Sequence, residues 1–253
     1  MSEALRVLVL GQSNSAGASL PGGAQPWPAL LAGALPAALG RPVEVTFRTF
    51  YSHASGAQAY LDRELARHEP DLVVLTMTPF AFLQPMVGPG VRRRYGERAG
   101  RLYTRFEARF DAVTRDRGAT ATHANRLARR LSRAVLGAAP VSSYETVLEG
   151  TNTALRRIAR EEHVRAVAFQ GFVRVPEGSR REQRRGAELL TRFYADVRAA
   201  ARASRCDYIN LNELHTDDRD SWYYPDGLHI TAEAHVLVAR TIQAWAEEAV
   251  AKP

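Results

Sequence analysis

The sequence predicts an α/β fold in which a central, mostly parallel sheet of five strands lies between two layers of helices. Three observations support this prediction. Short apolar runs bounded by turn residues alternate with longer helical patterns. That alternation is typical of parallel strands joined by crossover helices. The length of 253 residues and the hydrophobic content of 45% fit one large domain with a substantial core.

The expected elements follow one another along the whole chain. Strands are expected at residues 5–10, 43–49, 71–77, 164–170 and 206–211. Helices are expected near residues 27–39, 57–68, 144–162, 186–203 and 231–250. Ligands of an open parallel sheet bind beyond the carboxyl ends of its strands. Polar residues that directly follow a strand are therefore the first candidates for a functional site.

The first such residues form the segment Gly11-Gln12-Ser13-Asn14-Ser15-Ala16-Gly17, after the apolar run from Leu5 to Leu10. A serine on a tight, glycine-bounded turn at a strand end can expose its hydroxyl group, and the backbone N–H groups that follow can point at a ligand. Ser13 is accordingly a candidate nucleophile. The alternative interpretation is an ordinary turn whose serine caps a helix.

A second polar motif lies near the other end of the chain, in Tyr224-Pro225-Asp226-Gly227-Leu228-His229. Asp226 and His229 are three residues apart at the entrance of the last predicted helix. A carboxylate in this position can orient one imidazole nitrogen and leave the other to accept a proton from a serine. The alternative is a turn aspartate beside a structural histidine.

Together, the motifs Gly11-x-Ser13 and Asp226-x-x-His229 resemble the first and last blocks of the SGNH, or GDSL-like, serine hydrolase family. The resemblance implies a three-layer, flavodoxin-like fold and hydrolysis of a carboxylic (acyl or acetyl) ester by a Ser-His-Asp triad, without a cofactor. The Gly-Gln-Ser-Asn sequence is similar to the first motif of the carbohydrate acetylesterases within this family. By position, Gly56 matches the glycine whose backbone N–H binds the oxyanion together with that of Ser13.

The third family block departs from the expected pattern. Where the family has Gly-x-Asn-Asp, this chain has Thr78-Pro79-Phe80-Ala81, so Phe80 takes the place of the asparagine that donates to the oxyanion. Such a donor is worth roughly 3 to 4 kcal/mol of transition-state stabilisation. Thr78 is one candidate replacement. The other side chains considered are those of Thr76, Gln84 and Asn152.

This departure leaves two alternatives to an ester hydrolase. One is a catalytically weak or inactive binding protein that has kept the fold. The other is an acyltransferase that uses the same triad but passes the acyl group to an acceptor other than water. The presence of both the serine and the Asp-x-x-His motif favours the hydrolase.

Residues 91–139 read as an arginine-rich helical insertion within a single domain that spans residues 1–253. The segment has thirteen arginines against four acidic residues, whereas the whole chain has a formal net charge of +7. Arg101, Arg105 and Arg109 recur at helical spacing, and a second helix is expected at 124–136. A lid beside the active-site edge is one interpretation of this insertion. Its charge indicates either a solvated basic face or attraction of an anionic substrate or surface, while no nucleic-acid partner is expected. The run from Arg180 to Arg185 reads as a loop that leads into a helix.

Cysteine and histidine content and the absence of certain motifs argue against metal-binding, disulfide-rich and nucleotide-binding proteins. The single cysteine, Cys206, rules out a disulfide framework and a thiolate metal cluster, and the seven histidines show no His-Glu-x-x-His spacing, so no metal is expected. No phosphate-loop motif is present. The sequence shows neither a leader pattern nor an apolar stretch of about 20 residues, so the default location is cytoplasmic. Substrate-binding residues and oligomeric state are not predicted.

Overall fold

The computed structural model describes residues 4–17, 20–105, 135–175, 178–215, 219–224 and 229–251. The chain divides into two compact units. The first comprises Met1–Pro79, Glu145–Arg174 and Ala187–Pro253, and the second comprises Phe80–Tyr144 and Val175–Gly186.

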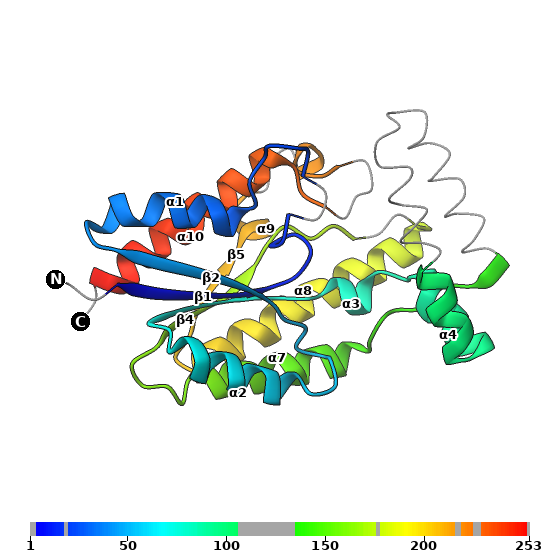
Figure 1. Cartoon of the computed structure of the whole chain (residues 1–253). Helices are drawn as coiled ribbons and strands as arrows, with labels where there is room; N and C mark the ends of the chain where they lie inside the picture. Colours follow the sequence, from blue (N-terminus) through cyan, green and yellow to red (C-terminus); the bar gives the residue numbers. More distant parts are fainter. Residues whose placement is uncertain are drawn as a thin grey trace. The chain divides into compact units, whose positions relative to one another are not determined.

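The first unit is built on a five-stranded, entirely parallel sheet in the order β2-β1-β3-β4-β5 (Figure 1). Its strands are β1 (Leu5–Gly11), β2 (Val43–Thr49), β3 (Leu72–Thr76), β4 (Arg165–Gln170) and β5 (Asp207–Asn210). This arrangement confirms the predicted α/β class and the five predicted strands. Because β1 lies between β2 and β3, the polar turn that follows β1 emerges near the middle of the carboxyl edge.

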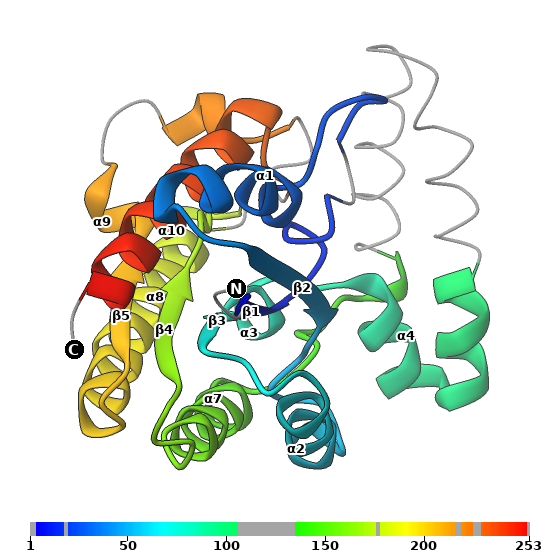
Figure 2. The same cartoon turned by 60° about the vertical axis from the view of Figure 1, so that its left-hand side comes forward.

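Helices cover both faces of this sheet. One face carries α1 (Trp27–Leu39) and α10 (Ala232–Ala251), which lie side by side (Figure 2). The other face carries α2 (Ala57–His68), α7 (Tyr144–Ile158) and α8 (Arg180–Ala203), which make the crossovers leading to β3, β4 and β5. The short helices α9 (Leu211–Leu214) and η1 (Arg219–Trp222) follow β5.

The core between the sheet and the α1/α10 layer is apolar and well buried. Val7 and Val9 of β1 pack there with Leu31 of α1 and Ile242 of α10. Burying one such side chain contributes roughly 1.5 to 3 kcal/mol. The extended apolar runs therefore form interior strands, and this rigid layer fixes where β1 ends.

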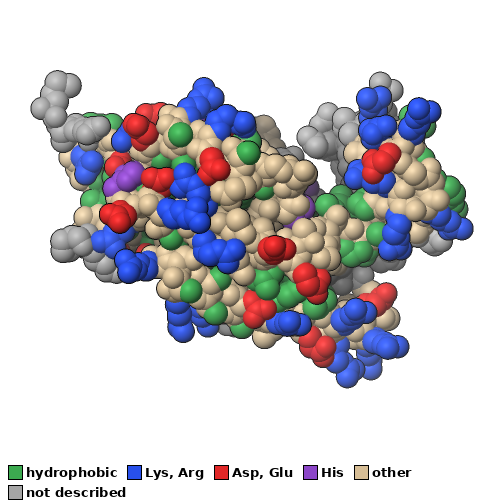
Figure 3. All heavy atoms as spheres, turned by 90° about the horizontal axis from the view of Figure 1, so that it is seen from below, with side chains coloured by type: hydrophobic (Ala, Val, Ile, Leu, Met, Phe, Trp, Pro, Cys, Tyr) green, Lys and Arg blue, Asp and Glu red, His purple; other side chains and the backbone are tan. Residues whose placement is uncertain are grey.

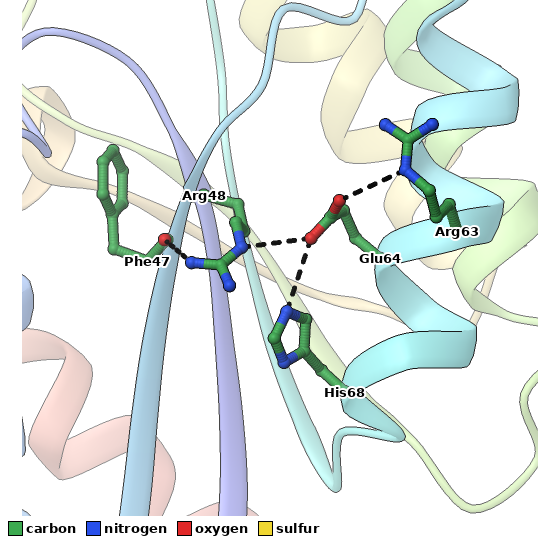
Figure 4. Close-up of polar contacts among 5 residues, drawn as sticks. All are labelled: Phe47, Arg48, Arg63, Glu64 and His68. Atoms are coloured by element: carbon green, nitrogen blue, oxygen red, sulfur yellow. Dashed lines mark hydrogen bonds and ion pairs between the residues drawn. The ribbon is translucent and has the colours of Figure 1, made fainter.

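The opposite layer combines buried apolar side chains, such as Leu61 of α2 and Leu155 of α7, with charged contacts. The buried Glu64 carboxylate of α2 lies 3.1 Å from Arg48 on β2, and 3.4 Å and 3.6 Å from His68 and Arg63 of its own helix (Figure 4). Arg157 of α7 forms further ion pairs with Asp62 of α2 and with Glu161, which follows α7. Basic and acidic side chains are interspersed on this face of the molecule (Figure 3), so it presents no field of a single sign.

The second unit contains α3 (Phe80–Leu83), α4 (Val87–Tyr95) and a helical stretch at residues 97–105. Met86 and Ala139 are joined by an antiparallel bridge. A side chain on Gly90 would lie 2.5 Å from the carbonyl oxygen of Gly137, so only glycine permits this close approach. Arg101 and Arg105 are helical as predicted, whereas Arg109 and most of the predicted helix 124–136 fall outside the described residues.

The prediction that Arg180–Arg185 forms a loop is wrong, because α8 begins at Arg180. The reason is a capping box that the sequence contains. The Ser179 backbone N–H donates to the Glu182 carboxylate at 2.8 Å, and the Glu182 backbone N–H donates to the Ser179 hydroxyl at 3.3 Å. Ser-x-x-Glu is a known helix start signal, and here it outweighs the repulsion of four neighbouring arginines.

Among the described residues, no helix is both long enough and apolar enough to cross a bilayer.

Candidate active site

The turn after β1 is shaped by a glycine that leaves room for a serine. A Cβ atom on Gly11 would lie 2.3 Å from the Ser15 Oγ and 2.7 Å from its Cβ, so the buried Ser15 side chain occupies the space that any larger residue at position 11 would need. The turn covers residues 13–17, and its backbone closes with a hydrogen bond of 2.9 Å from the N–H of Ala16 to the carbonyl of Gln12. Gly17 completes it with φ of 69°, a left-handed conformation that favours glycine.

The residues on this turn have different environments. Ser13 and Asn14 are half-buried, whereas Gln12 and Ser15 are buried, with exposed fractions of 7% and 4%. The Gln12 side chain points into the sheet, where its Nε2 donates to the carbonyl oxygens of Phe50 at 3.0 Å and Thr76 at 3.3 Å. Ser13 is thus the serine of this motif with access to solvent.

His229 lies in a short segment held by backbone hydrogen bonds. Its carbonyl accepts the N–H of Tyr224 at 2.9 Å, and the N–H of Thr231 donates to the carbonyl of Trp222 at 3.0 Å. Thr231 also caps α10, because its hydroxyl accepts the N–H of Ala234 at 3.4 Å. The half-buried His229 is therefore fixed just before the last helix, while Asp226 lies outside the described residues.

One hydrogen bond joins the two motifs directly. The Asn14 side-chain oxygen accepts the backbone N–H of Ile230 at 3.4 Å, across 216 residues of sequence. Asn14 follows Ser13 and Ile230 follows His229, so this contact brings the candidate nucleophile and the candidate base into one neighbourhood. The bond is long and individually weak, but it fixes which segments meet.

His235, six residues further on, has a different role. It is 1% exposed, and its Nδ1 accepts the backbone N–H of Trp27 at 3.1 Å, which ties α10 to the start of α1. Burial lowers the pKa of His235 to about 4. This histidine is therefore neutral at pH 7 and belongs to the core.

Gly56 begins α2 as its N-cap residue. It has φ of 79°, is exposed, and lies six residues beyond Phe50, whose N–H donates to the Gly11 carbonyl at 2.8 Å. The loop between them is anchored to α7 by a contact of 3.2 Å between the hydroxyls of Ser52 and Thr151. The left-handed φ explains why a glycine stands at position 56.

Thr78 follows the end of β3 and is 1% exposed. Its hydroxyl is buried and has no hydrogen-bond partner among the described residues, so its proton is uncommitted. Of the other donors considered, the Thr76 hydroxyl is committed to the carbonyl of Leu10 at 3.1 Å. The side-chain oxygen of Asn152 is buried without a partner in the described part of the chain, and Gln84 belongs to the second unit.

A further polar group at the carboxyl edge was not predicted. Asn212, at the start of α9, donates to the carbonyl of Gly171 at 2.9 Å and to the Tyr194 hydroxyl at 3.2 Å, and its side-chain oxygen accepts the N–H of Val173 at 3.2 Å. These contacts connect the segments that follow β4 and β5. The available signal was positional, because Asn212 directly follows a predicted strand, as Gln12 does.

An aromatic cluster lies beside the histidine segment. The rings of Phe172 and Trp222 stack with centroids 5.4 Å apart, and His215 lies 6.2 Å from Phe172. Phe172 is buried and Trp222 is half-buried, so the stacked rings pack η1, which precedes His229, against the segment that follows β4.

The sheet and its two helix layers form a three-layer α/β/α architecture. The sequence profile of the GDSL-like lipase/acylhydrolase family matches residues 7–242. The chain belongs to that family, as the two motifs indicated, and is a hydrolytic enzyme. No curated protein matches the sequence.

Solved structures with this fold include several esterases. A lipase/acylhydrolase from Enterococcus faecalis is 16% identical, with a TM-score of 0.59 over 96% of each chain. A catalytic mutant of an acetylxylan esterase from Geobacillus stearothermophilus is 12% identical, with a TM-score of 0.52 over 96% of this chain and 94% of that chain. An esterase from Pseudoalteromonas sp., inhibited by monoethylphosphonate, is 14% identical, with a TM-score of 0.51 over 95% of this chain and 98% of that chain.

Proposed function

We propose that this enzyme hydrolyses a small acyl or acetyl ester through a Ser13-His229-Asp226 triad and an acyl-enzyme intermediate. The observation that carries the proposal is the hydrogen bond between the Asn14 side chain and the Ile230 backbone, which joins the residues next to Ser13 and His229. Family membership supplies the reaction class. The substrate's acyl and alcohol groups are left open.

In the first half of the reaction, the Ser13 Oγ attacks the ester carbonyl carbon while His229 accepts the serine proton. The tetrahedral intermediate then collapses, the bond to the leaving oxygen breaks, and His229 returns the proton to the departing alcohol. Asp226 holds the imidazole tautomer that this exchange requires. The product of this half is an acyl-Ser13 ester.

In the second half, His229 takes a proton from water, and the resulting nucleophile attacks the acyl-Ser13 carbonyl. Collapse of the second intermediate releases the carboxylic acid and returns the proton to Ser13. The backbone N–H groups of Ser13 and Gly56 are the proposed oxyanion donors. Thr78 is a third candidate donor, since its buried hydroxyl is uncommitted and would have to rotate toward the substrate.

The test uses a fluorophosphonate probe and p-nitrophenyl acetate with three proteins: wild type, Ser13→Ala and Ser15→Ala. We expect the probe to label Ser13 in the wild type, and Ser13→Ala to lose both labelling and about a thousandfold or more of the esterase rate. Ser15→Ala is the matched control, because Ser15 lies on the same turn but is buried. It should keep labelling and most of the activity.

Two results would contradict the proposal. One is a folded wild-type protein that neither reacts with the probe nor cleaves the ester, which would favour a binding protein. The other is labelling of the wild type at a serine other than Ser13. Release of p-nitrophenol that requires an added acceptor alcohol would instead identify an acyltransferase with the same nucleophile.

A further inference from the structure

The side chain of Gln12 connects three strand ends at the candidate site. Strand β1 lies between β2 and β3, and Gln12 is the residue between the end of β1 and Ser13. We propose that Gln12 is a positioning residue, which holds the loops after β2 and β3 at fixed places on either side of Ser13. The inference rests on the proposed function, because it concerns the oxyanion donors on those loops.

The Gln12 side-chain nitrogen donates hydrogen bonds to two carbonyl oxygens. The Gln12 Nε2 lies 3.0 Å from the carbonyl oxygen of Phe50, the first residue after β2, and 3.3 Å from that of Thr76, the last residue of β3. Strand β1 ends at Gly11, and the chain turns away from the sheet at residues 13–17. The side chain of Gln12 thus extends the connection between the strands beyond the end of the backbone ladder.

The chemistry of the position requires a primary amide. The carbonyl of Phe50 needs a donor, since Phe50 is only 3% exposed and a buried carbonyl is costly to leave unpaired, while that of Thr76 is half-buried. One amide nitrogen carries two hydrogens and no charge. Glutamate has a similar shape but no N–H to donate, methionine has neither donor nor charge, and asparagine is one methylene group shorter.

The two carbonyls lead directly into the loops that carry the proposed donors. The loop after Phe50 reaches Gly56, and the residues after Thr76 reach Thr78. Oxyanion donors act at 2.7–3.1 Å, and a misplacement of about 1 Å can lower a rate roughly a hundredfold. Loosening these loops should therefore weaken transition-state binding without removing any group that touches the substrate.

Gln170 provides a matched control at the same carboxyl edge of the sheet, at the end of β4. It is 1% exposed, and its Nε2 donates to the carbonyl of Gly171 at 2.8 Å. It is a glutamine of similar burial, bonded to a carbonyl at a strand end, but its acceptor belongs to the next residue of the chain, Gly171, and not to a neighbouring strand. Its loss should affect stability and leave the loops beside Ser13 in place.

The experiment compares wild type, Gln12→Met, Gln12→Asn and Gln170→Met by p-nitrophenyl acetate kinetics and thermal unfolding. Assays are run well below each protein's Tm, so that only folded enzyme is compared. We expect both Gln12 variants to lose roughly tenfold to a hundredfold in kcat with KM changed less than threefold. Gln170→Met should keep kcat within about threefold of the wild type although its Tm also falls.

The inference is overturned if a folded Gln12 variant keeps wild-type kcat, or if Gln170→Met loses as much kcat as Gln12→Met does. Gln12→Asn keeps an amide and serves if Gln12→Met does not fold. These outcomes are distinct from failure of the proposed function, which would appear as a wild-type enzyme that is not labelled at Ser13.

Discussion

The serine side and the histidine side of the candidate site are held in different ways. The turn that carries Ser13 is anchored by contacts across the sheet: Gln12 bonds to Phe50 and Thr76, which are 38 and 64 residues away. The segment that carries His229 is held by backbone hydrogen bonds from Tyr224 to His229 and from Thr231 to Trp222, and by a long-range bond to the Asn14 side chain.

This difference indicates where each half of the site draws its stability. The residue before Ser13 is bonded to residues at the ends of two neighbouring strands, so displacing the serine turn should cost more free energy than a local opening of the backbone. The histidine segment can move when a few backbone bonds break. We therefore expect the proposed nucleophile, Ser13, to be held more firmly than the proposed base, His229, and substitutions on the two sides to have different effects.

The largest expected effect comes from the histidine itself. His229→Ala should lower kcat/KM for p-nitrophenyl acetate by about 10⁴-fold or more, because Ser13 loses its general base. Tm should change by only a few degrees, since His229 is half-buried in a locally held segment. Steady-state kinetics and thermal unfolding measure the two quantities.

His215→Ala is the control for this variant. His215 is also half-buried and near the same segment, but its ring packs 6.4 Å from that of Trp222. It should retain at least a tenth of the wild-type rate. A His229→Ala enzyme that does the same would remove His229 from the reaction.

Much of the fold was predictable because apolar periodicity reports burial directly. The β2 bounds and those of α1 and α2 agree with the predicted ranges, and the other strands differ by a residue or two at their ends. The predicted start of α8, near residue 186, is wrong because the capping box of Ser179 and Glu182 starts the helix at Arg180. Local hydrogen bonds at a helix start outweighed the charge pattern.

The site was predictable only in its outline. Motif spacing indicated Ser13 and His229, but the meeting of their segments depends on a contact between residues 216 apart. The role of Gln12 was not visible either. A glutamine after a strand has no fixed partner in the sequence, and only the strand order places Phe50 and Thr76 within its reach. The catalytic roles of Ser13, His229 and Asp226 stay predictions, and Asp226 lies outside the described residues.

A second, smaller effect should appear in stability as the pH falls. The pKa of His235 is about 4 in the folded protein and about 6.5 when unfolded, so the unfolded chain binds the proton first. The stabilisation is complete above pH 6.5 and is lost as the pH falls toward 4, by up to about 3 kcal/mol. Protonation also turns Nδ1 into a donor and breaks the bond from Trp27.

Urea unfolding between pH 7 and pH 4.5 measures this loss. His235→Asn keeps an acceptor near the position of Nδ1 but cannot be protonated there, so its stability should depend less on pH than that of the wild type. Equal pH dependence in the two proteins would show that His235 does not contribute. Such a result would also weaken the distinction between the core histidine and His229.

The smallest expected effect concerns the hydrogen bond between the Asn14 side chain and the Ile230 backbone. Asn14→Ala removes the acceptor of the Ile230 N–H, a hydrogen bond of 3.4 Å worth about 0.5 to 1.5 kcal/mol. If that bond holds the histidine segment against the serine turn, kcat should fall by roughly three- to tenfold while Tm changes little. Kinetics with p-nitrophenyl acetate give the first quantity and thermal unfolding the second.

Asn14→Asp tests whether the side chain acts as the hydrogen-bond acceptor of the Ile230 N–H. A carboxylate oxygen still accepts the Ile230 N–H, so Asn14→Asp should retain more activity than Asn14→Ala. Equal losses in the two variants would mean that the acceptor is not what matters. A stability loss in Asn14→Ala as large as that caused by Gln12→Met would contradict the comparison itself, because the bond would then belong to the core rather than to a locally held segment.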